Sequence, residues 1–204
     1  MDARAPLDGW RPALLGALFL AFLSTLGDWI WDRWIPAGQV IHGVVHGAVI
    51  FAALGLVLGL AARHRGGGAR VVGRAVGGEV VLGILVSASF YPLYSGLGAA
   101  ALFITWMGLW LGTAGIQRWV DPAPEGLPKT LLRGCAAAVV SGLAFWAVSG
   151  IWTAPPPGGP NLPWNFLCWT FAFAPGFLAL FLRRADAPSP PPAELAAGGE
   201  VPQT

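Results

Sequence analysis

Charge is the property that this sequence has least of. Asp, Glu, Lys and Arg together make up 11% of its 204 residues, while 55% are hydrophobic. A soluble globular domain carries about 25% charged residues, so the deficit excludes an ordinary water-soluble domain. The formal net charge is only +2, and the basic residues form no stripe interleaved with aromatic residues, which argues against a nucleic-acid partner.

Cysteine and histidine are equally scarce. The two cysteines, Cys135 and Cys168, lie far apart inside apolar stretches, so neither a zinc knuckle nor a disulfide framework is expected. The three histidines are too few for a membrane di-iron centre, and none follows His64 to activate a serine on a later helix. Walker A, Rossmann and HExxH motifs are also missing. The sequence therefore gives no sign of the commonest nucleotide-binding or metalloprotease sites.

Long apolar runs are what the sequence has in abundance. Each is about 20 residues long, the length at which a helix crosses a hydrocarbon core of about 30 Å. We therefore predict an all-α integral membrane protein, a bundle of about six transmembrane helices in one domain over residues 1–184. Residues 185–204 are Pro-rich and are predicted to be a disordered cytoplasmic tail. The predicted spans are about 12–30, 40–62, 71–91, 97–116, 131–152 and 163–182.

The first span has an alternative interpretation as a cleaved signal peptide. Arg4 and Arg11 precede its apolar run, as basic residues do in such peptides. No clean A-x-A cleavage site ends the run, and Trp-rich sequence follows it. We therefore favour an uncleaved helix.

Basic residues gather on one side of the predicted bundle. With six spans, eleven of the twelve Lys and Arg residues lie on the side that holds both termini, and Arg33 lies on the other. The positive-inside rule places the basic side in the cytoplasm. We therefore predict cytoplasmic termini in an inner membrane of bacterial type, which the preference for Arg over Lys and the abundance of Ala and Gly also suit. The eleven residues are Arg4, Arg11, Arg63, Arg65, Arg70, Arg74, Arg118, Lys129, Arg133, Arg183 and Arg184.

Small residues recur at four-residue spacing. In the second span, Gly43, Gly47, Gly55 and Gly59 form two GxxxG pairs. In lipid, close backbone approach over small residues is a main source of helix association. The stripe predicts helix packing inside the bundle, with a homo-oligomer interface as the alternative.

Four ionisable residues lie on one predicted hairpin. Asp28 and Asp32 end the first helix, and His42 and His46 begin the second. Residues four apart share a helix face. Counting from the turn at about 1.5 Å per residue, Asp32 and His42 lie near the surface, and Asp28 and His46 lie deeper at a matched level.

This cluster has three interpretations. Asp oxygens and His nitrogens suit one divalent transition metal such as Zn, Fe or Mn. The same groups serve a proton relay or a ligand-binding site. They also occur simply as structural hydrogen-bonding groups at helix interfaces. The sequence leaves all three open.

Glu79 is the remaining acidic residue within a predicted span. Its expected partner is Arg74 on the same helix or Arg133 at the start of the fifth. The alternative is that Glu79 faces a cavity and forms a second titratable station, as a proton-coupled pathway requires.

Four tryptophans lie deeper than the residues expected at the membrane surface. Trp106, Trp110, Trp146 and Trp169 form a candidate aromatic pocket for a lipid or a flat hydrophobic ligand, although we slightly favour the alternative. The alternative is that these rings fill gaps beside glycines or face lipid.

Three classes of function follow from these observations. The first is binding or transport of a small or lipidic ligand through Asp28, Asp32, His42, His46 and Glu79. The second is a metal-dependent membrane enzyme with His42, His46, Asp28 and Asp32 as ligands. The third is a structural or assembly subunit that works through its glycine stripes and exposed aromatic residues.

Overall fold

The computed structural model describes residues 7–34, 40–98, 100–121, 124–153 and 161–184, and six helices make up most of this part of the chain. All six are long and apolar enough to cross a membrane. The all-α fold and the six helices predicted from the sequence are therefore confirmed. The helices are α1 (Trp10–Trp34), α2 (Val40–His64), α3 (Arg70–Leu97), α4 (Ala100–Val120), α5 (Leu127–Thr153) and α6 (Leu162–Phe181).

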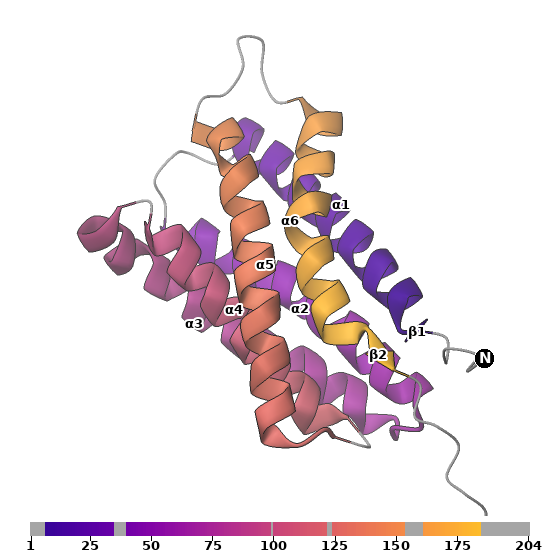
Figure 1. Ribbon diagram of the computed structural model, residues 1–204. Coiled ribbons are helices and arrows are strands. Elements are labelled where there is room, and N and C mark those ends of the chain that lie inside the picture. Colours follow the sequence, from indigo (N-terminus) through magenta and orange to yellow (C-terminus); the bar gives the residue numbers. More distant parts are fainter. Residues whose placement is uncertain (1–6, 35–39, 99, 122–123, 154–160, 185–204) are drawn as a thin grey trace, which may run out of the picture.

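The helices do not follow one another around the bundle in simple chain order. The last helix, α6, lies between α1 and α5, and α4 joins α5 to α3. The most extensive interface is between α2 and α3, whereas the consecutive helices α1 and α2 share only a small one. Figure 1 shows α5 and α6 running beside each other with α1 next to α6. The weak seam of the bundle is therefore the one between α1 and α2.

The first and last described segments meet at one end of the bundle. Strand β1 (Leu7–Asp8) pairs antiparallel with strand β2 (Arg183–Arg184), two residues each. Gly9 follows with a φ of +95°, and a Cβ there would lie 2.0 Å from the carbonyl oxygen of Phe181. Only glycine permits this contact, which fixes the start of α1 to the end of α6. We call this end of the bundle, which also holds residues 65–69 and 124–126, the basic end.

The core lies where α1, α2, α4 and α6 converge. Trp110, Phe173 and Phe177 are its largest fully buried apolar side chains, and Leu20, Leu54, Leu58 and Leu180 surround them. Many large apolar side chains on the opposite helix faces are exposed, such as Leu15 and Leu132. A helical bundle with apolar residues both inside and outside is what a lipid environment requires.

Backbone contact between α2 and α3 depends on glycine. A Cβ at Gly55 would lie 2.6 Å from the Cα of Val76, and one at Gly59 would lie 2.7 Å from the Cα of Val72. Both distances are too short for any side chain. The two helices therefore pack backbone against backbone in this region.

Helix α3 is longer than the sequence predicted. The predicted span ended at Tyr91, but α3 continues through Pro92 to Leu97. Membrane helices tolerate an internal proline, so Pro92 does not end α3. The helix ends instead at Gly98, which has a φ of +55° and donates its N–H to the carbonyl oxygen of Tyr94.

Candidate functional site

Asp28 lies in the last third of α1, among apolar side chains. Its Oδ2 accepts a hydrogen bond of 2.7 Å from the indole Nε1 of Trp169 on α6. Among the residues that the structure describes, Asp28 forms no ion pair. The side chain is half-buried, so a carboxyl group is held inside the bundle by a single neutral donor. A charge in such a place is expensive, and this makes it a functional candidate.

His46 on α2 lies against Gly27, the residue that precedes Asp28. Its imidazole occupies the space that Gly27 leaves free, because a Cβ at Gly27 would lie 2.0 Å from the Cε1 of His46. The structure therefore places His46 at the level of Gly27 and Asp28, the depth match that counting along the hairpin predicted. The Asp28 carboxylate nevertheless bonds to Trp169 on α6.

The other two members of the predicted cluster, Asp32 and His42, have side chains outside the described residues. In the part of the chain that is described, no three His, Cys, Asp or Glu side chains gather as a metal site needs. The metal site of two aspartates and two histidines, and the enzyme that it implied, therefore stay predictions.

Trp169 belongs to a cluster of four aromatic rings from three helices. We call Trp106, Phe145, Trp169 and Phe173 the aromatic cluster. Trp106 stacks on Phe145 with ring centroids 4.3 Å apart, and Trp169 stacks on Phe173 at 5.5 Å. The centroids of Trp106 and Trp169 lie 6.3 Å apart. Asp28 bonds to one edge of this cluster, so the rings form a rigid apolar wall beside the carboxylate.

The opposite edge of the aromatic cluster also has a polar partner. Trp106 donates from Nε1 to the Oγ of Ser141 at 2.9 Å. Ser141 in turn donates to the backbone carbonyl of Ala172 on α6. Because both indole N–H groups are satisfied, the two rings are fixed in orientation as well as in position.

Two of the four tryptophans, Trp110 and Trp146, fit the alternative of gap filling or lipid contact better than the candidate pocket. Trp110 is fully buried in the core, where it packs edge-on to Phe177 above Gly176. Trp146 is 67% exposed on the outer face of α5. Phe145, one residue away, is turned into the aromatic cluster instead. The positions along the helices were visible in the sequence, but the rotation of each helix about its axis was not.

Glu79 is more deeply buried than any other charged residue described, with no exposed surface. Its Oε2 accepts a hydrogen bond of 3.3 Å from the Oγ1 of Thr113 on α4. Its Oε1 is buried and, among the described residues, has no hydrogen-bond partner. An unsatisfied oxygen inside a bundle is destabilising, so Glu79 is a second functional candidate.

The predicted partners of Glu79 are both elsewhere. Arg74 is exposed, and Arg133 bonds to Glu125 instead. Glu79 shares a helix face with Ala75 and Gly83, which are also buried. This face of α3 is buried, whereas Arg74 lies on an exposed face of the same helix, so the expected ion pair with Arg74 does not form.

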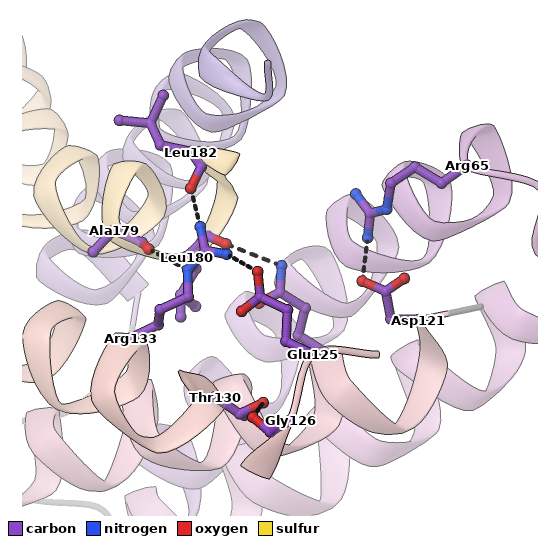
Figure 2. A network of polar contacts seen from close by, with 10 residues as sticks. Arg65, Asp121, Glu125, Gly126, Thr130, Arg133, Ala179, Leu180 and Leu182 are labelled. Carbon is purple, nitrogen blue, oxygen red and sulfur yellow. Dashed lines mark hydrogen bonds and ion pairs between the residues drawn. The ribbon is translucent and has the colours of Figure 1, made fainter. Parts of the chain in front are cut away.

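A polar network closes the basic end (Figure 2). Arg133 on α5 donates from Nη1 to Glu125 at 2.8 Å, from Nε to the carbonyl oxygen of Ala179 at 3.1 Å, and also to the carbonyl of Leu182. Arg65 pairs with Asp121 at 3.1 Å. A cation at a helix C-terminus satisfies free carbonyl groups and the helix dipole. Arg133 thus holds the end of α6, a role that sequence spacing did not indicate.

Cavities lie at both ends of the bundle. One of about 200 Å³ between α2, α3 and α4 is bounded by Trp106 and by the polar side chains Ser87, Tyr91 and Thr105. A larger groove of about 850 Å³ lies between α1 and α2 at the basic end. The smaller cavity shares Trp106 with the aromatic cluster, so it adjoins the wall that Asp28 contacts.

No family model, curated protein or solved structure matches this chain. The fold defines its class, a protein with six helices suited to cross a membrane several times. Any inference about its activity therefore rests on the chemistry of its own side chains.

Proposed function

We propose that this protein binds a small or lipidic ligand at the end of the bundle opposite the basic end and transports it. The observation that carries the proposal is the Asp28 carboxylate, held inside an apolar bundle by the single N–H of Trp169. Among the described residues, its second oxygen has no hydrogen-bond donor, so it can accept a donor or a positive charge from a ligand. The aromatic cluster beside it supplies apolar contact area, the usual composition of a ligand pocket.

Glu79 supports transport rather than binding alone. It lies deeper toward the basic end than Asp28, on a different helix, and one of its oxygens has no partner among the described residues. Two ionisable groups at different depths inside a bundle are typical of proteins that move protons or ions. In this proposal Asp28 receives the ligand and Glu79 takes up the proton that moves with it.

Orientation is the second part of the proposal. Arg65, Arg133 and the Arg183–Arg184 strand all lie at the basic end, and basic loops stay in the cytoplasm of bacterial inner membranes. The Asp28 site then opens toward the outer leaflet. Gly68→Cys, at the basic end, is expected to escape a membrane-impermeant thiol reagent in intact cells, whereas Asn161→Cys is expected to react. The reverse pattern would refute this orientation.

The ligand proposal is tested by what co-purifies with the protein. Detergent-purified wild type, Asp28→Asn and Trp146→Phe are extracted and compared by liquid chromatography and mass spectrometry. Asp28→Asn keeps an oxygen acceptor for Trp169 and loses only the charge. Trp146→Phe is the control, because it exchanges one exposed aromatic ring for another. We expect a molecule enriched in wild type and Trp146→Phe and depleted in Asp28→Asn. The same set of molecules in all three samples, at equal foldedness, would contradict the proposal.

A further inference from the structure

A wide groove lies between α1 and α2 at the basic end. Its volume is about 850 Å³, and it runs along Trp10, Leu15 and Phe19 on α1 and Leu56 and Leu60 on α2. These five side chains are between 38% and 66% exposed. The groove exists because α1 packs on α6 and meets α2 only narrowly.

The length of the groove matches half of a membrane. From Trp10 to Phe19, α1 rises about 14 Å. A hydrocarbon core is about 30 Å thick, so the groove spans about the depth of one leaflet. Its apolar wall therefore suits an acyl chain that lies parallel to α1.

The mouth of the same groove is basic. Arg11, His64 and Arg65 line it together with the apolar residues. The Arg11 guanidinium lies over the Trp10 ring, 5.4 Å from its centroid. Arg65 keeps its ion pair with Asp121 through Nη2. Strand β2, Arg183–Arg184, lies beside the start of α1, so further positive charge adjoins the mouth.

We propose that this groove is a binding site for one anionic phospholipid. An acyl chain lies between α1 and α2, and the phosphate lies at Arg11 and His64, with Arg65 beside them. Arginine binds phosphate through several N–H groups at once, and basic pockets between membrane helices recognise anionic headgroups. A second copy of this chain is the less favourable occupant, because it would bring another basic end to the same mouth.

This site is independent of the proposed ligand site. The lipid groove lies at the basic end between α1 and α2, whereas Asp28 bonds to α6 toward the other end. A substitution at the lipid groove therefore tests the lipid site alone.

The test compares two lipids with identical palmitoyl and oleoyl chains. Phosphatidylglycerol or phosphatidylcholine is added to the delipidated, detergent-purified full chain, and bound lipid is counted by native mass spectrometry. We expect one phosphatidylglycerol per chain, bound at least about fivefold more tightly than phosphatidylcholine, which is the effect of roughly one cationic side chain near a headgroup.

Variants locate the site. Arg11→Gln is expected to weaken phosphatidylglycerol about fivefold and to leave phosphatidylcholine unchanged. Arg63→Gln is the matched control, because Arg63 is exposed at the same end of α2 and does not line the groove. Leu60→Trp, which fills the groove, is expected to lower the binding of both lipids. Melting followed by circular dichroism confirms that each variant is folded.

Three results would overturn the lipid site. Equal binding of the two lipids would show that the mouth does not select charge. Equal effects of Arg11→Gln and Arg63→Gln would show that only the overall charge of this end matters. A dimer mass that carries no lipid, and that Leu60→Trp abolishes, would assign the groove to a second copy of the chain.

Discussion

At the scale of single residues, Glu79 and Asp28 stand out because each is held by one neutral donor. Thr113 donates to Glu79, and Trp169 donates to Asp28. Neither bond neutralises a charge. Glu125, in contrast, has a cationic partner in Arg133. If the proposed function holds, each of the two carboxyl groups is expected to contribute little to folding.

This interpretation predicts the effect of Glu79→Met. Methionine has a similar volume, carries no unsatisfied oxygen and adapts to irregular gaps. Replacing a buried polar group by a well-fitting apolar one is often neutral or stabilising, so we expect the free energy of unfolding to stay equal or to rise by up to about 2 kcal/mol. Thr113 is expected to bond instead to a carbonyl of its own helix.

Thermal unfolding in detergent, followed by circular dichroism, measures this effect, and proton flux into proteoliposomes measures the function. We expect Glu79→Met to melt at the same temperature as wild type or above it and to lose the flux. A large fall in melting temperature would show that Glu79 stabilises the fold through a partner.

At the scale of helices, contact between α2 and α3 is set by residues without side chains. Gly55 lies against the backbone of Val76 and Ala75. Backbone atoms cannot rotate out of the way as a side-chain tip can. Any Cβ at position 55 therefore has to move one helix relative to the other.

We therefore predict opposite effects for two Gly→Ala substitutions. Gly55→Ala is expected to destabilise the protein by about 1–3 kcal/mol through overpacking. Gly77→Ala on α3 meets no atom within 4 Å in the described part of the chain, and alanine favours helix by up to about 1 kcal/mol. The melting temperature should thus fall for Gly55→Ala and hold or rise for Gly77→Ala. Equal effects would mean that the α2–α3 contact is loose.

Helix positions and helix rotations differed in how well the sequence predicted them. The six apolar runs gave the helices, because length and hydropathy are local properties. Counting from the first turn also placed His46 at the level of Asp28. Rotation about the helix axis depends on packing with distant segments, which explains why Phe145 rather than Trp146 joins the aromatic cluster. The same cause separates Glu79 from the arginines expected to pair with it.

At the scale of the whole molecule, α1 is joined to the rest mainly through α6. The β1–β2 pair and the contact of Gly9 with Phe181 fix its start to the end of α6. Along α2 it makes narrower contacts, where Val57 faces Gly16 and His46 faces Gly27. The seam between α1 and α2 therefore carries a groove at the basic end and the contact of His46 with Gly27 toward the other end.

The central claim is that the charge of Asp28 recognises a ligand, and a matched pair of ions tests it most directly. Tetraphenylphosphonium and tetraphenylborate have nearly the same size and opposite charge. Their equilibrium binding is measured on detergent-purified wild type and on Asp28→Asn, with foldedness checked by circular dichroism. We predict that Asp28→Asn weakens the cation about tenfold or more, a loss of about 1.4 kcal/mol, and leaves the anion unchanged. Equal affinity of the cation for both proteins would contradict the claim.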